Sequence, residues 1–219
     1  MKLQRLLILG DSYSTYEGHI PEGHAVYYSG HRAAAPDVSD VRLTWWGRLI
    51  EATGATLVRN DSWSGATICY RGYNGVDCSH SSSFIYRLES LLADGFFDEH
   101  PVDTVLVFGG TNDSWSEAPL GELSFLHTER GDLYAARPAI AHLSRRLSEI
   151  FPDARVAFIG NTDIKPEITE AQRLACVHDG HLYIPLKDID KLEGHPTERG
   201  MAEICEQVLA ALLAAEQAV

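Results

Sequence analysis

The sequence lacks three features that would each point to a particular class of protein. It has only four cysteines in 219 residues, and no two are spaced as Cys-x-x-Cys, so neither a zinc site nor a redox dithiol is indicated. No apolar run approaches the roughly 20 residues needed to span a bilayer. Basic residues are also scarce: 18 Lys and Arg against 31 Asp and Glu give a formal net charge of −13. That charge disfavours nucleic acids and anionic membranes as partners.

A secretory leader is not apparent either. The apolar run near the N-terminus, Leu6 to Leu9, is too short for a signal peptide, and no small-residue cleavage site follows it. We therefore expect a cytoplasmic protein. Cys69 and Cys78 bracket a short loop and could pair if oxidised, but a cytoplasmic location favours free thiols. Cys205 lies on an apolar helical stripe and is expected in the core.

Short apolar runs alternate with amphipathic segments along the whole chain. The runs predict strands at residues 6–9, 55–58, 104–108, 155–159 and 182–184. The segments predict helices at residues 43–53, 84–92, 133–150, from Pro166 towards Cys176, and from about 196 to 215. No linker or repeat divides the chain. We therefore expect one α/β domain, residues 1–219, with a five-stranded parallel sheet and helices on both faces.

The first of these strands is followed at once by Gly10, Asp11 and Ser12. Its four consecutive apolar residues predict burial on both faces. Ligands of open parallel sheets bind beyond the carboxyl ends of the strands, so Ser12 lies where a nucleophile would be useful. An irregular segment rich in Gly, Pro, Tyr and His, about residues 16–41, starts from the same strand end. A loop of this length predicts a wall or lid of a binding site.

Polar turns follow several other predicted strands and should gather Ser12, Gly65, Asn112 and the segment around His195 on one rim. Acyl transfer requires a nucleophile, a base for its proton and donors for the developing oxyanion. Four stretches resemble the conserved blocks of the SGNH (GDSL) hydrolases, in the family's order. They are Gly10-Asp11-Ser12-Tyr13-Ser14, Ser62-Trp63-Ser64-Gly65, Gly110-Thr111-Asn112-Asp113, and Gly194-His195-Pro196-Thr197 followed by Gly200.

This resemblance implies a flavodoxin-like three-layer α/β/α sandwich and a serine esterase mechanism without metal or other cofactor. Ser12 would attack the ester carbonyl and His195 would move its proton. The backbone N–H groups of Ser12 and Gly65 and the amide of Asn112 would form the oxyanion hole. Candidates for substrate contact are Asp11, Tyr13 and Asp113, and Asp113 has helix capping as its alternative role. 

The chain departs from the family at the acid of the triad. The last block usually reads Asp-x-x-His, but Leu192 stands three residues before His195. A histidine base needs a partner on its Nδ1–H to hold the tautomer. Asp190 is our first candidate and Glu193 the second. A backbone carbonyl or a water that orients His195 is a third possibility.

The substrate class follows from the residues around the serine. A small-molecule ester is expected, most consistent with acetyl groups on a hydroxylated or carbohydrate alcohol, because residues 16–41 offer little aliphatic surface. Lipase, lysophospholipase and thioesterase activities are alternatives, as is a carbohydrate-binding domain that has lost the chemistry. Seven aromatic residues are candidates for a stacking wall: Tyr13, Tyr16, Tyr27, Tyr28, Trp46, Tyr73 and Trp115.

Overall fold

Five parallel strands form the centre of the computed structural model, which describes residues 4–30, 37–126 and 128–217. The strands are β1 (Arg5–Gly10), β2 (Thr56–Ser62), β3 (Thr104–Phe108), β4 (Arg155–Gly160) and β5 (Leu182–Pro185). Their order across the sheet is β2-β1-β3-β4-β5, which is the flavodoxin-like order. The predicted fold class is therefore confirmed.

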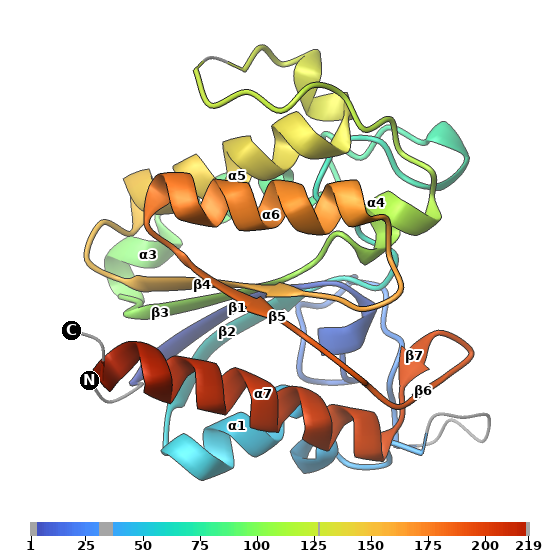
Figure 1. The fold of residues 1–219 in the computed structure, drawn as a ribbon. Helices are drawn as coiled ribbons and strands as arrows, with labels where there is room; N and C mark the ends of the chain where they lie inside the picture. Colours follow the sequence, from blue (N-terminus) through green and yellow to red (C-terminus); the bar gives the residue numbers. More distant parts are fainter. Residues whose placement is uncertain (1–3, 31–36, 127, 218–219) are drawn as a thin grey trace.

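Helices cover both faces of this sheet and complete a three-layer sandwich (Figure 1). On one face lie α2 (Phe84–Ala93), α5 (Ala136–Ile150) and α6 (Pro166–Asp179), with the short α3 (Phe96–Glu99) beside α2. On the other face α1 (Trp45–Thr53) packs against α7 (Glu198–Gln217). Alternate residues of one strand enter the two cores: Leu7 and Leu9 face α2 and α5, whereas Leu6 and Ile8 face α1 and α7. The expectation that β1 is buried on both faces is correct.

Most predicted elements are found within three residues of their expected ends, and strand β3 matches at both ends. Residues 59–62 are an exception, because we expected a polar turn there and the structure continues β2 to Ser62. The reason is that β1 pairs with β2 as far as Gly10 and Ser62. The polar side chains of Asn60, Asp61 and Ser62 are buried and find hydrogen-bond partners there, so they can occupy a strand.

A small hairpin after β5 was not foreseen. Strands β6 (Lys191–Leu192) and β7 (His195–Pro196) pair antiparallel. Glu193 and Gly194 form the tight connection with φ of 50° and 80°, a backbone conformation that glycine adopts without steric cost. Thr197 then caps α7, since its hydroxyl accepts from the N–H of Gly200 at 3.1 Å. The hairpin therefore presents His195 from a fixed position at the start of α7.

The segment at residues 16–41 is packed against the sheet as far as it is described, residues 31–36 lying outside the described residues. Tyr16, Tyr28 and Val38 are buried in the core beneath α1 and α7. The hydroxyl of Tyr28 donates to the carbonyl of Pro196 at 2.9 Å, which ties the segment to the histidine hairpin. The described part of the segment therefore runs beside the hairpin that carries His195.

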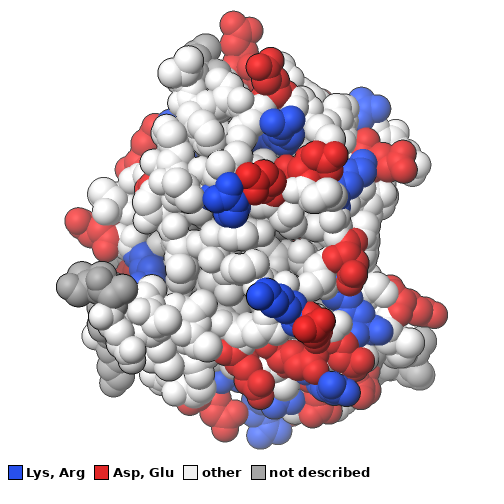
Figure 2. Space-filling model, in the orientation of Figure 1, with Lys and Arg blue, Asp and Glu red and all other residues white. Residues whose placement is uncertain are grey.

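All four cysteines are free and buried, and Cys205 lies in the core as expected. None of the helices in the described part of the chain is both long enough and apolar enough to cross a membrane. On the face shown in Figure 2, acidic side chains lie intermixed with basic ones over the helices.

Candidate active site

Ser12 lies directly beyond the carboxyl end of β1, at the start of a short 3₁₀ helix, η1 (Ser12–Ser14). The turn is tight: a Cβ at Gly10 would lie 2.3 Å from the Ser62 hydroxyl and 2.5 Å from the Ser14 Cβ, so only glycine fits. Asp11 caps η1 by accepting from the N–H of Tyr13 at 3.0 Å. The sequence Gly-Asp-Ser is therefore dictated by the turn that presents the serine.

His195 meets this serine from the other end of the chain. Its Nε2 lies 3.1 Å from the Ser12 Oγ, although the two residues are 183 positions apart in sequence. Its Nδ1 faces the backbone carbonyl of Glu193 at 3.4 Å. An imidazole that carries its proton on Nδ1, facing a carbonyl acceptor, has the Nε2 lone pair free to take the serine proton.

Backbone donors lie next to the serine. Among the described residues, the N–H groups of Ser12 and Gly65 make no hydrogen bond. Gly65 has a φ of 83° and open space where a Cβ would be, so a substrate can approach its backbone closely. Unpaired N–H groups beside a nucleophile are suited to stabilise an oxyanion.

Asn112, on the short helix α4 (Thr111–Trp115), is held in one orientation by two hydrogen bonds. Its Nδ2 donates to the carbonyl of Ala66 at 2.9 Å, and its Oδ1 accepts from the Tyr73 hydroxyl at 2.9 Å. A side-chain amide has two N–H donors, so one remains for a substrate oxygen. Tyr73 thus fixes which end of the amide is the donor, a role that the sequence did not indicate.

The structure does not bring Asp190 to His195. The Asp190 carboxylate accepts a hydrogen bond from the Thr197 hydroxyl, and its carbonyl accepts from the Thr197 N–H. This arrangement holds the hairpin on α7. It also requires glycine at position 200, because a Cβ there would lie 2.0 Å from the Asp190 carbonyl oxygen. The side chain of Glu193 is exposed, and only its carbonyl faces the imidazole. Of our three alternatives, the described contacts of Nδ1 favour the third, a backbone carbonyl.

Three predicted substrate contacts are also corrected. Asp11, Tyr13 and Asp113 each have 0% of their surface exposed, so they lie behind the site. The Asp113 carboxylate accepts from the N–H groups of Ile68 at 2.8 Å and Cys69 at 3.0 Å, and it anchors the segment that follows Gly65. The Tyr13 hydroxyl donates to the carbonyl of Gly194. These residues position the site.

Burial changes the ionisation of the carboxyl groups behind the serine. Desolvation raises the pKa of Asp11 to about 7, although the hydrogen bond from the Tyr13 N–H opposes the shift. Desolvation also raises the pKa of Asp113, against the hydrogen bonds from Cys69 and Ile68. The pair therefore bears less negative charge near neutral pH than two exposed carboxylates would.

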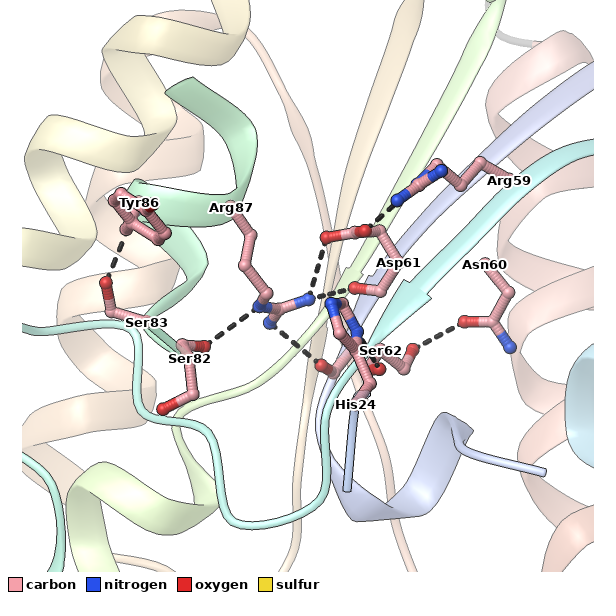
Figure 3. A network of polar contacts seen from close by, with 10 residues as sticks. His24, Arg59, Asn60, Asp61, Ser62, Ser82, Ser83, Tyr86 and Arg87 are labelled. Carbon is pink, nitrogen blue, oxygen red and sulfur yellow. Dashed lines mark hydrogen bonds and ion pairs between the residues drawn. The ribbon is translucent and has the colours of Figure 1, made fainter. Parts of the chain in front are cut away.

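A buried arginine supports the same turn from the opposite side (Figure 3). Arg87 on α2 donates to the carbonyl of Gly10 at 3.1 Å and to that of Ser82 at 2.9 Å. It also donates to the Asp61 carboxylate at 3.0 Å and to its carbonyl. The guanidinium thereby joins the ends of β1 and β2 to helix α2. Arg87 lies within the helix predicted at residues 84–92, and the sequence pattern did not indicate this role.

Aromatic rings surround His195. Tyr27 stacks on the imidazole with ring centroids 3.6 Å apart and planes 7° apart. Tyr13 and Trp115 meet it at 5.4 and 5.8 Å. A face-to-face stack is poor for two neutral rings but favourable when one of them is a cation. The Tyr27 ring therefore both holds the imidazole and stabilises its protonated form.

Comparison with known proteins agrees with this geometry. The sequence model of the family described as GDSL-like Lipase/Acylhydrolase matches residues 4–212. The chain belongs to this family. It is thus an ester-bond hydrolase, in line with the resemblance that the four blocks indicated. The comparison with curated proteins gives no match.

Solved structures of similar sequence support the assignment. A candidate GDSL-like lipase from Bacteroides ovatus is 37% identical, with a TM-score of 0.89 over 98% of this chain and 100% of that chain. One from Bacteroides uniformis is 39% identical, with a TM-score of 0.88 over 96% of each chain. An acetyl xylan esterase from Butyrivibrio proteoclasticus shares the fold at 17% identity, with a TM-score of 0.63 over 99% of this chain and 65% of that one.

No group of three or more His, Cys, Asp or Glu side chains that could hold a metal ion occurs among the described residues of the hydrolase.

The orientation of His195 is tested by replacing Tyr27. Replacing Tyr27 with Leu removes the ring face, and we expect kcat/KM to fall about 3- to 30-fold, the worth of a partly desolvated cation–π contact. Tyr27→Phe keeps the ring and should stay within about threefold of wild type. In the Leu variant the acid limb of the pH profile of kcat/KM should move to lower pH, because the protonated imidazole is stabilised less.

Asp190→Asn provides the comparison for this prediction. Asparagine can still accept from the Thr197 hydroxyl, so we expect kcat to stay within about fivefold, whereas losing the orienting acid of a Ser-His-Asp triad costs about 10⁴-fold. A 10³-fold loss in Asp190→Asn, or equal activities of Tyr27→Leu and wild type, would contradict the arrangement described.

The raised pKa of Asp11 has a consequence for stability. Between the unfolded pKa of about 4 and the folded value of about 7, the folded protein holds a proton that the unfolded chain releases. Stability should therefore fall as pH rises through this range. Asp11→Asn removes this slope, so its free energy of unfolding relative to wild type should rise by about 3 kcal/mol from pH 4.5 to 8.

Urea unfolding at several pH values measures this difference. Asp153→Asn, at an exposed carboxylate, is the control, and its free energy of unfolding should change with pH as that of wild type does. A difference between Asp11→Asn and wild type that stays constant with pH would show that Asp11 is ionised throughout.

Proposed function

We propose that the protein is a serine esterase in which Ser12 and His195 act through an acyl-enzyme and remove acetyl groups from a carbohydrate. The observation that carries the catalytic part is the 3.1 Å contact between Ser12 Oγ and His195 Nε2, beside two backbone N–H groups that make no hydrogen bond to any described residue. A nucleophile within reach of its base and of oxyanion donors is the geometry that ester hydrolysis requires.

In the first half of the reaction, Ser12 Oγ attacks the ester carbonyl and its proton passes to His195 Nε2. The oxyanion of the tetrahedral intermediate accepts from the N–H groups of Ser12 and Gly65 and from the Asn112 amide. The intermediate collapses, the bond to the alcohol oxygen breaks, and the alcohol leaves with the proton from His195.

In the second half, a water takes the place of the alcohol. His195 accepts its proton while the oxygen attacks the acyl carbonyl. Collapse of the second intermediate returns the proton to Ser12 Oγ and releases the carboxylic acid. Through both halves the Glu193 carbonyl and the Tyr27 ring hold the imidazole in place.

The preference for a carbohydrate rests on the side chains around the serine and on the relatives. Tyr27, Tyr73 and Trp115 are partly exposed near Ser12, His195 and Asn112, and such rings pack against sugars while their polar atoms reach hydroxyls. The acetyl xylan esterase of the same fold acts on an acetylated polysaccharide, as its name states. Its identity of 17% to this chain shows only that the fold is shared.

Lipid ester hydrolysis is the second candidate. The two Bacteroides proteins that are 37% and 39% identical bear the name GDSL-like lipase, and their coverage of the chain is almost complete. A lipase needs a long apolar groove for its acyl chain. The length of the acyl group that is hydrolysed fastest decides between the two candidates.

The nucleophile is tested with a serine-directed fluorophosphonate. We expect labelling of wild type at the peptide that holds Ser12, and none in Ser12→Ala, whose kcat should fall about 10⁶-fold. Ser39→Ala, an exposed serine of the segment that follows, is the control and should label like wild type. Labelling of Ser12→Ala at another serine would refute the assignment.

Substrate class is tested by comparing kcat/KM for acetylated xylotetraose with that for 4-nitrophenyl palmitate. We expect at least tenfold higher values for the acetylated sugar, because the rings near Ser12 suit a hydroxylated alcohol better than an alkyl chain. Faster hydrolysis of the palmitate would favour the lipase.

A further inference from the structure

A cavity of about 400 Å³ lies next to the candidate active site and plays no part in the mechanism above. Its lining includes His24, Arg59, Trp63, Tyr86, Ser90 and Asp94. We call it the Trp63 cavity. Its volume is within the range of small-molecule sites. Figure 3 looks into this region, with strand β2 on one side and helix α2 on the other.

The Trp63 cavity and the candidate active site share one wall, the segment 61–65. Asp61 and Trp63 line the cavity, and Gly65 offers its free N–H to the active site. Two residues of chain span at most roughly 7 Å, so the backbones of Trp63 and Gly65 lie within the length of about one or two sugar residues of each other. A substrate with an ester at Ser12 and further sugar units can therefore extend into the cavity.

This shared wall is rigid. Arg87 closes the bottom of the cavity with a guanidinium that is 4% exposed and bonded to the carbonyls of Gly10 and Ser82 and to Asp61. On the other side the His24 ring packs on Trp63 at 4.4 Å, and its Nδ1 lies 2.9 Å from the Ser62 carbonyl. The site is thus preformed, and four of the five N–H donors of Arg87 are already used by the protein.

Several polar groups in the Trp63 cavity are unused. Within the described part of the chain, the indole N–H of Trp63, the hydroxyls of Tyr86 and Ser90, and the carboxylate of Asp94 make no hydrogen bond. Arg59 donates only through its Nε, to the Asp61 carboxylate at 3.0 Å, so its two terminal nitrogens make no hydrogen bond to a described residue. Donors and acceptors are both present, beside a tryptophan ring.

The charges in the Trp63 cavity balance. Arg59 and Arg87 are offset by Asp61 and Asp94, and burial lowers the pKa of His24, which favours its neutral form. An anionic ligand would meet two carboxylates, and a cation two guanidinium groups. A neutral polyhydroxyl ring can instead use the donors, the acceptors and the aromatic face together.

We propose that the Trp63 cavity is a sugar-binding subsite, which holds a neutral glycosyl residue of the substrate next to the one that carries the ester. The proposal rests on the function proposed above. In it, Trp63 supplies the stacking face, and Tyr86, Ser90, Asp94 and Arg59 hydrogen-bond the hydroxyls. The subsite gives preference for oligomers over acetylated monosaccharides, because a single ring at Ser12 does not reach the cavity.

The test compares two substrates with two cavity variants. Trp63→Leu removes the stacking face, and the double variant Ser90→Ala/Asp94→Asn alters two groups at the helix α2 side of the cavity. We expect the ratio of kcat/KM for acetylated xylotetraose to that for 4-nitrophenyl acetate to fall at least tenfold in the first and at least threefold in the second. Asp98→Asn, an exposed carboxylate of α3 that does not line the cavity, is the control and should leave the ratio unchanged.

An unchanged ratio in both variants would overturn the subsite. Where the ratio is unchanged because activity on both substrates falls by the same factor, the cavity residues act only through the shared wall.

A wild type that cleaves 4-nitrophenyl acetate but not acetylated xylotetraose would contradict the carbohydrate function itself. Calorimetric titration of Ser12→Ala with xylotetraose then tests separately whether the Trp63 cavity binds sugar. Binding that is lost in Ser12→Ala/Trp63→Leu would support it, and no binding at millimolar sugar would refute it.

Discussion

One buried guanidinium connects the parts of the molecule on which function depends. Arg87 binds the carbonyl at the end of β1, the carboxylate near the end of β2 and a carbonyl before helix α2. A buried charge is tolerated when it is paired and hydrogen-bonded, and Arg87 is paired with Asp61 and makes four hydrogen bonds. The polypeptide is therefore fixed at the point where two parallel strands end and Ser12 begins its turn.

The candidate site is mainly built from backbone groups, and neighbouring side chains hold these groups and the Asn112 amide in position. Asp113 binds two N–H groups after Gly65, Asp11 caps the turn of Ser12, and Tyr73 orients the Asn112 amide. The two carboxyl groups need not touch the substrate, because Asp11 and Asp113 are fully buried and accept from backbone N–H groups behind Ser12.

The sequence was sufficient for the parts of the structure that depend on local pattern. Apolar runs such as residues 104–108 specify a strand buried on both faces, and four motif stretches in family order indicated Ser12 and His195. Other features depend on contacts between distant segments. Asp190 was misplaced because a two-residue hairpin turns the chain between it and His195, and pairing with β1 keeps residues 59–62 in a strand. The Tyr27 stack arises in a segment with no periodic pattern, so no spacing rule could reveal it.

In the mechanism proposed above, His195 would be held by the contacts that the described residues make with it. A carboxylate partner stabilises the imidazolium by charge, whereas a carbonyl fixes only the tautomer. The face of Tyr27 adds electron density above the ring, and Tyr13 fixes the neighbouring Gly194 carbonyl. Orientation and charge stabilisation, which one aspartate provides in the triad, are thus divided between a backbone carbonyl and an aromatic face. Because that face comes from the segment that follows Ser12, the proposed nucleophile and the support of its proposed base belong to one stretch of chain.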